Sequence, residues 1–212
     1  PGIYSYLVSE ESGNKDNKGG ITYDTSVYKV QVKVTDNGKG ALQAEVSYPD
    51  GQQGIFFKNT YKPAPETVAM DIAKTLNGRD MTSDESFKLK VKAQDEASEG
   101  TQAKDDEKDT TNGATLKSTE LLFQNLKNGD KGVAPDYVTF TQPGIYQYAI
   151  SEESGHAVGV TYDKSVYYVK YVVTDDGNGH LVVQTLFGKD KDKLSEFKPS
   201  EGIQRPTAEF VN

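Results

Sequence analysis

The sequence predicts an all-β protein made of two β-sandwich modules, the first of which is incomplete. The segment PGIYSYLVSEESG at 1–13 recurs as PGIYQYAISEESG at 143–155, with ten of thirteen positions identical. Segments rich in β-branched and aromatic residues alternate with turns rich in Gly, Asp and Asn. The length of 212 residues is enough for two cores of ordinary domain size. A duplicated β module therefore accounts for the pattern.

The repeat sets the module boundaries. The segment 21–46 matches 160–185, and FFKN at 56–59 matches EFVN at 209–212. The second copy extends back to about residue 62 and includes a segment, 66–94, that has no counterpart before Pro1. Two prolines in KPAPET at 62–67 interrupt regular pairing and indicate a linker. We therefore expect the C-terminal part of a first module at 1–61 and a complete second module at 62–212.

The expected elements follow in chain order. Strands are predicted at 4–10, 27–34 and 41–48, and at the matching positions of the second copy. The turns DNGKG at 36–40 and DDGNG at 175–179 are typical of hairpins. The segments 93–118 and 188–206 are polar and predict exposed loops. A capping-type Ser before 118–126 favours a short helical turn there.

Composition excludes several classes of function. The formal net charge is -8, which disfavours nucleic acid and anionic membranes as partners. No run approaches the about twenty apolar residues of a membrane helix, so we expect no membrane insertion. The chain has no Cys, which excludes disulfides, thiolate metal sites and cysteine nucleophiles together. A protein of this kind outside a cell needs another covalent or packing device to stabilise it.

Three polar residues of the second copy fall in the inward phase of their strands. Lys74 shares a phase with Met70 and Ile72, because side chains two apart face the same way. Glu152 continues the row of Tyr146, Tyr148 and Ile150, and Asn212 continues that of Ala208 and Phe210. The lysines of SFKLKVKA alternate with apolar residues and are predicted to be solvated: Lys88, Lys90 and Lys92. Phase alone favours three unrelated strand ends that reach water.

The alternative is that the three inward side chains meet. Burial disfavours both charged forms, so it lowers the pKa of Lys74 and raises that of Glu152. A proton can then pass between them and leave a neutral amine, which is a nucleophile. Held against the Asn212 amide, with Glu152 moving protons, this amine can expel ammonia. The product would be an intramolecular Lys–Asn isopeptide bond.

The motifs AKTLNGRDM, PGIYQYAISE, VTYDKSVYYVKYVVTDDGNG and a final F-x-N resemble the isopeptide-containing pilin domains of Gram-positive bacteria. This is the streptococcal T-antigen type, and the resemblance covers essentially the whole chain. It implies a CnaB-like, immunoglobulin-type sandwich. It also implies a bond between Lys74 and Asn212 with Glu152 as catalyst. Lys74, Glu152 and Asn212 occupy the matching positions.

In the first copy the match is partial. Glu10 and Asn59 fill two of the three positions, and no lysine-bearing strand is available for the third. Lys15 and Lys18 lie in the Gly-rich segment GNKDNKGG, on the wrong element to substitute. We prefer the explanation that the chain is a fragment of a longer protein. The alternative is a split module that strands from another chain complete in trans.

The resemblance and the duplicated fold indicate a structural protein: a pilus subunit or adhesin stalk repeat on the cell wall of a Gram-positive bacterium, outside the cell. Its partners would be other subunits or repeats of the same kind. The cross-link would be self-made and single-turnover, so the protein is not expected to be an enzyme and needs no cofactor. Shaft subunit and repeat of a large adhesin remain equal alternatives.

Two other functional classes are less consistent with the sequence. An adhesin module could bind a host protein or glycan through its acidic loops at 93–118 and 188–206, although these lack the exposed aromatic anchors of most binding sites. A hydrolase is disfavoured, because the two histidines, His156 and His180, lie in Gly-rich turns without partners for a triad or a zinc site. The turn DDGNGH lacks the spacing of a calcium-binding EF-hand.

Overall fold

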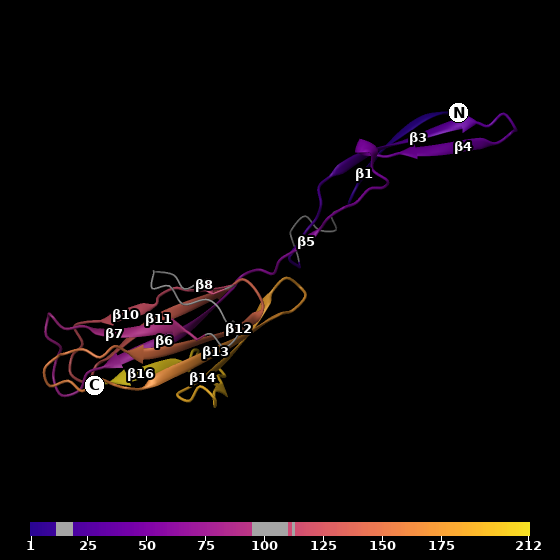
Figure 1. Ribbon diagram of the computed structural model, residues 1–212. Helices are drawn as coiled ribbons and strands as arrows, with labels where there is room; N and C mark the ends of the chain where they lie inside the picture. Colours follow the sequence, from indigo (N-terminus) through magenta and orange to yellow (C-terminus); the bar gives the residue numbers. More distant parts are fainter. Residues whose placement is uncertain (12–18, 95–109, 112) are drawn as a thin grey trace. The chain divides into compact units, whose positions relative to one another are not determined.

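The computed structural model describes residues 1–11, 19–94, 110–111 and 113–212. Its regular structure is nearly all β, which confirms the predicted fold class. The chain divides into two compact units, Pro1–Lys62 and Pro63–Asn212, which are described separately below (Figure 1). No helix in the described part of the chain is long and apolar enough to span a membrane.

The first unit contains one small antiparallel sheet. Its strand order is β1-β3-β4, from β1 (Gly2–Ser9), β3 (Val27–Asp36) and β4 (Leu42–Ser47). A second pairing joins β2 (Ile21–Thr22) to β5 (Thr60–Tyr61), and a short 3-10 turn spans Pro49–Gly51. Most side chains of β1 and β4 are exposed on both faces of the sheet.

The second unit is a sandwich of two sheets (Figure 1). The six-stranded sheet has the order β10-β7-β12-β13-β14-β15, and the five-stranded sheet has the order β16-β6-β11-β9-β8. The six strands of the first sheet are β7 (Phe87–Ala93), β10 (Glu120–Phe123), β12 (Gly144–Glu152), β13 (Val166–Asp175), β14 (Leu181–Gly188) and β15 (Ser195–Glu196). The five strands of the other are β6 (Glu66–Thr75), β8 (Thr110–Thr111), β9 (Ala114–Leu116), β11 (Lys131–Phe140) and β16 (Thr207–Val211).

The duplication seen in the sequence extends to strand register. Gly2 of β1 pairs with Val34 of β3, and the equivalent Gly144 of β12 pairs with Val173 of β13. The hairpin that follows keeps the same register, since the pair Asp36 and Leu42 recurs as Asp175 and Leu181. Because a slip of one residue would turn every side chain to the opposite face, the shared register shows that both copies aim equivalent residues in the same direction.

The core of the second unit lies between its two sheets. In β13 the side chains of Tyr167, Val169, Tyr171 and Val173 are buried in strict alternation with less buried neighbours. Aromatic rings contribute much of the packing, and the rings of Phe140 and Tyr171 lie 5.2 Å apart. Large apolar side chains of both sheets complete the core, among them Met70, Ile72, Phe87, Leu89, Val138, Tyr148, Ile150 and Phe210.

Two local predictions were wrong. The segment 118–126 contains no helical turn; Glu120–Phe123 is strand β10, which pairs with β7 because sheet pairing outweighs the capping signal. The segment 93–118 is not a continuous exposed loop, since β9 within it pairs with β11 and buries Ala114 and Leu116. The rest of that predicted loop, 95–109 and 112, lies outside the described residues.

Candidate cross-linking site

Three strand ends of the second unit bring the predicted reactive residues together. β6 and β16 are parallel neighbours in one sheet, with Lys74 of β6 opposite Phe210 of β16. Asn212 follows β16 directly, and its backbone N–H donates to the carbonyl oxygen of Thr75 at 3.0 Å. Glu152 closes β12 in the other sheet. The site therefore lies where the first and last strands of the unit meet the facing sheet.

One carboxylate oxygen contacts both prospective reactants. Glu152 Oε1 lies 2.8 Å from Lys74 Nζ and accepts a hydrogen bond from Asn212 Nδ2 at 3.0 Å. The side chains of Lys74 and Glu152 are both 0% exposed. Lys74 and Glu152 are therefore not strand ends that reach water, and the half-buried Asn212 meets them through its hydrogen bond to Glu152.

The surroundings of Lys74 favour a neutral amine. Lys74 Nζ lies 4.9 Å from the centre of the Phe87 ring. The neighbours of Lys74 on the inward row, Ile72 and Leu76, are both core residues. Burial lowers the pKa of Lys74, and it outweighs the opposing effect of Glu152 and Asp163. A lowered pKa increases the fraction of unprotonated, nucleophilic amine at a given pH.

Asp163 is a site residue that the sequence analysis missed. Its peptide N–H donates both to Asn212 Oδ1 at 2.8 Å and to Glu152 Oε2 at 2.9 Å. Its carboxylate accepts hydrogen bonds from the backbone N–H groups of Ser165 and Val211. Burial works to raise the pKa of Asp163, but these two amides, together with the Ser165 side chain and the nearby Lys74, outweigh burial and hold the pKa below its ordinary value. The signal that could have found it is the pattern Y-D-x-S, which is present in both copies.

The first unit repeats the hydrogen bonds of the asparagine amide and of the aspartate carboxylate. Asn59 Nδ2 donates to Glu10 Oε1 at 2.7 Å, and the peptide N–H of Asp24 donates to Asn59 Oδ1 at 2.8 Å. The Asp24 carboxylate accepts from the N–H groups of Lys58 and Ser26, and both lower the pKa of Asp24. Glu10 and Asn59 are thus brought together as the repeat predicts.

The second carboxylate oxygen of Glu10 is unusual. Among the described residues it is buried and has no hydrogen-bond partner. A buried carboxylate oxygen without a donor is costly, so its environment favours a donor at this position. Lys15 and Lys18, which the sequence analysis judged to be on the wrong element, lie outside the described residues.

Glu153 and the lysines of β7 that pair with it behave as solvated side chains. Glu153 faces outward and pairs with Lys90 at 3.1 Å and Lys88 at 3.6 Å. The turn DDGNGH forms the β13–β14 hairpin, in which His180 Nδ1 lies 3.3 Å from Asp176 Oδ2. Within the described ranges, no group of three or more His, Cys, Asp or Glu side chains could hold a metal ion.

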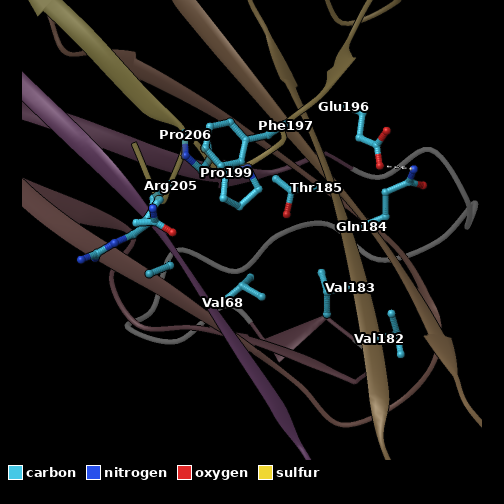
Figure 2. Close-up of a pocket in the computed structure, with 12 residues that line it drawn as sticks. Val68, Val182, Val183, Gln184, Thr185, Glu196, Phe197, Pro199, Arg205 and Pro206 are labelled. Atoms are coloured by element: carbon cyan, nitrogen blue, oxygen red, sulfur yellow. Dashed lines mark hydrogen bonds between the residues drawn. The ribbon is translucent and has the colours of Figure 1, made fainter. Parts of the chain in front are cut away.

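A hollow of about 510 Å³ lies at the edge of the second sandwich, beside the predicted loop at 188–206. Figure 2 shows Phe197, Pro199 and Pro206 around it, with Val68 and Val183 from the two sheets. Gln184 donates a hydrogen bond to Glu196 at its rim. The loop is therefore partly apolar, in contrast to the uniformly solvated loop that the sequence suggested, but its lining carries no reactive set of side chains.

Comparison with known proteins identifies the family. A model described as "FctA: Spy0128-like isopeptide containing domain" matches residues 1–62 and 70–202. The chain belongs to this family. The predicted resemblance to streptococcal isopeptide pilin domains is therefore confirmed, and the family is one of structural proteins.

A curated relative agrees with the family assignment. A curated "Pilin" from Streptococcus pyogenes serotype M1 is 35% identical over 180 residues, which are 83% of this chain and 45% of that pilin. The chain thus spans less than half the length of this relative. The crystal structure of the major pilin from Streptococcus pyogenes aligns at 18% identity and a TM-score of 0.25, covering 100% of this chain and 69% of that one. The T3.2 major pilin of the same species aligns at 17% identity and a TM-score of 0.24, covering 99% and 66%.

Proposed function

We propose that this chain is part of a structural subunit or stalk repeat of a Gram-positive surface pilus or adhesin, stabilised by a self-made isopeptide bond between Lys74 and Asn212. The observation that carries the proposal is the contact of one buried Glu152 oxygen with both the lysine amine and the asparagine amide. The site would work outside the cell, on the cell wall, with other subunits or repeats of the same kind as partners.

The proposed bond-forming step needs no cofactor, because Glu152 can move the proton and ammonia is the leaving group. Lys74 Nζ, as a neutral amine, attacks Cγ of Asn212, and Glu152 takes a proton from the attacking nitrogen. Glu152 then delivers a proton to Nδ2, the C–N bond to that nitrogen breaks, and ammonia leaves. The products are one secondary amide and one ammonia. Glu152 contacts both nitrogen atoms in the structure, so it needs no rearrangement to move the proton.

The cross-link joins strands that tension on the unit would separate. β6 begins the unit and β16 ends it, and the two pair in parallel from Asp71 and Thr207 to Thr75 and Val211. Pulling on the two ends of the unit therefore shears β6 against β16. A covalent bond between Lys74 and Asn212 would carry this load and prevent the 137 residues between them from extending.

Single-molecule pulling tests the mechanical function. With handles at Pro63 and at the C-terminus, the native second unit should show no unfolding step, because the force passes through Lys74 and Asn212. Lys74→Met keeps the length of the buried side chain but removes the amine, and should release about 480 Å at roughly 3.5 Å per residue. A native unit that extends by the same length as Lys74→Met would contradict the proposal.

A second function is favoured by the first unit, where Glu10 and Asp24 hold the Asn59 amide as the complete site holds Asn212, and where Glu10 Oε2 has no partner among the described residues. We infer that this unit accepts a lysine-bearing strand, supplied by another chain in the split-module alternative. A peptide with the sequence of Glu66–Thr75 is the probe, because that strand supplies the lysine in the second unit. Incubation should give an adduct lighter by one ammonia than the sum of the two masses.

The control for the peptide experiment is Asn59→Ala, which removes the acceptor amide and should give no adduct. An adduct that persists in Asn59→Ala, or no adduct with the native chain after prolonged incubation, would contradict the second function. Recognition of a host protein or glycan remains the alternative for the loop at 188–206. Binding of a glycan or host protein that Phe197→Ala abolishes would favour it over the stalk.

A further inference from the structure

In both copies an equivalent aspartate holds the side-chain amide of the asparagine: Asp163 in the second unit and Asp24 in the first. In the second unit the peptide N–H of Asp163 donates to Asn212 Oδ1 at 2.8 Å. In the first unit the peptide N–H of Asp24 donates to Asn59 Oδ1, also at 2.8 Å. The described part of the first unit provides no lysine at this site, so the contact does not depend on a bound amine. The fold itself therefore places the peptide N–H of the aspartate on the asparagine oxygen.

The carboxylate of the same residue holds the strand end in place. Asp163 Oδ2 accepts from the N–H of Val211 at 3.0 Å, and Asp163 Oδ1 accepts from the N–H of Ser165 at 2.8 Å. Asp24 repeats both contacts, with Lys58 at 2.8 Å and Ser26 at 2.9 Å. Val211 and Lys58 each directly precede the reacting asparagine. Each aspartate thus fixes both the backbone before the asparagine and the oxygen of its side chain.

An amide is a poor electrophile, and attack by an amine moves negative charge onto its oxygen. A hydrogen-bond donor already placed on that oxygen stabilises the developing charge without reorganisation. The Asp163 N–H is placed in this way on Asn212 Oδ1, and it also orients Glu152 through Oε2 at 2.9 Å. The two contacts place the acceptor amide and the proton carrier relative to each other.

We propose that Asp163 completes the cross-linking machinery: its peptide N–H is the donor to the oxyanion formed on Asn212 Oδ1, and its carboxylate positions the strand end that carries Asn212. This inference rests on the proposed isopeptide bond and adds a component to it. Asp24 has the same two roles toward Asn59. The backbone N–H makes direct contact with the reacting group, whereas the carboxylate acts through Val211 and Ser165.

Two substitutions separate these roles. Replacing the Asp163 amino acid by malic acid, its α-hydroxy analogue, turns the peptide N–H into an ester oxygen and keeps the carboxylate. Asp163→Ala keeps the N–H but removes both contacts of the carboxylate. Each protein is prepared unfolded, diluted into native buffer, and sampled for the loss of ammonia by mass spectrometry. Asp24→Ala removes the same contacts from the first unit and serves as the matched control.

The ester variant should lose ammonia about 10²–10³-fold more slowly than the native chain, as expected when an oxyanion donor is removed. Asp163→Ala should also lose ammonia more slowly than the native chain, and Asp24→Ala should lose ammonia at the native rate. In a Lys74→Met background, where no reaction starts, the ¹³Cγ resonance of Asn212 should move upfield in the ester variant. A purely structural role for Asp163 would leave this resonance unchanged in a folded protein.

Near-ultraviolet circular dichroism of the Lys74→Met background reports whether each variant folds. If Asp163→Ala does not fold, the ester variant alone decides the question. An ester variant that folds and loses ammonia within threefold of the native rate overturns the inference and leaves the proposed bond intact. A native chain that loses no ammonia overturns the proposed function instead.

Discussion

The two copies of the site share the hydrogen bonds of the asparagine amide but not those of the glutamate. Asn59 donates to Glu10 and accepts from the Asp24 N–H, as Asn212 does with Glu152 and Asp163, with distances that agree within a few tenths of an ångström. The bond from the Asp163 N–H to Glu152 Oε2 has no counterpart among the described residues of the first unit, where Glu10 Oε2 has no partner. Among the described residues, a buried amine is added in the second copy, from Lys74 on β6. The acceptor amide and its carboxylate are therefore built by the part of the module that both copies share, whereas the nucleophile comes from β6, which has no counterpart in the described first unit.

The two copies also differ in how far their equivalent side chains are buried from solvent. Tyr4 and Tyr6 of β1 are 50% and 54% exposed, whereas the equivalent Tyr146 and Tyr148 of β12 are 9% and 1% exposed. The strands that cover β12 and its sheet are absent from the described first unit. Because desolvation is what lowers the pKa of a lysine, the covering strands contribute to the chemistry as well as to the stability of the second unit.

The largest effect is expected from removing the amine of the complete site. Lys74→Met should lower the free energy of unfolding of the second unit by about 5 kcal/mol, the chain-entropy value for a closed loop of this length. For a unit of this size the midpoint of thermal unfolding should fall by about 10–20 °C. Differential scanning calorimetry measures both quantities. A midpoint within about 2 °C of the native value would remove the mechanical argument for the cross-link.

The second effect concerns pH. In Asn212→Ala the amine stays free, and burial holds the pKa of Lys74 below that of the unfolded chain. The unfolded state then binds more protons, so stability should rise with pH from the lowered pKa up to about 10.4. Urea unfolding at several pH values measures the slope. The double variant Lys74→Met, Asn212→Ala should lack it, and an equal slope in both proteins would contradict a neutral buried amine.

The sequence predicts the parts of the site that side chains supply, because strand phase shows which side chains point into the core. Strand phase placed Lys74, Glu152 and Asn212 inward and Lys88 and Lys90 outward, and the structure agrees. Phase could not show that the three inward residues meet, because that depends on the parallel pairing of β6 with β16 and on the facing sheet.

Two features were missed for identifiable reasons. Asp163 acts on Asn212 through its peptide N–H, and every residue except proline has one, so the repeated pattern Y-D-x-S marks the position but does not reveal this role. The segment 118–126 was interpreted as a helical turn from a local capping residue, but its edge position beside β7 requires a strand. Roles of the backbone and pairing between distant strands are the parts that a local pattern does not encode.

A third, smaller effect distinguishes the two glutamates. Glu152→Gln removes the proton carrier between Lys74 and Asn212 and should slow the loss of ammonia by about 10²–10⁴-fold. Glu10→Gln keeps the acceptor for Asn59 and removes a buried oxygen that has no partner in the described part of the chain. It should change the stability of the first unit by less than about 0.5 kcal/mol. Hydrogen exchange of the β3 amides measures this, and strong deprotection would contradict the expectation.

The smallest effect involves β11, a strand without a counterpart in the described first unit. Asp136 of β11 is fully buried, and burial raises its pKa. The folded state therefore binds a proton that the unfolded state has released, so this contribution to stability is lost as pH rises through the raised pKa. Asp136→Asn is neutral at every pH and should remove this pH dependence of stability. Unfolding curves between pH 3 and neutrality measure the free energy of unfolding of both proteins. The same dependence of this free energy on pH in both would contradict the expectation.

The intact mass of the native chain under denaturing conditions tests the central claim most directly. The mass should lie below the value calculated from the sequence by one ammonia, and a digest should contain a branched peptide that joins Lys74 to Asn212. Lys74→Met and Asn212→Ala should each show the full calculated mass. A native chain at full mass would contradict the cross-link, and a deficit of two ammonia molecules would contradict the distinction between the two copies.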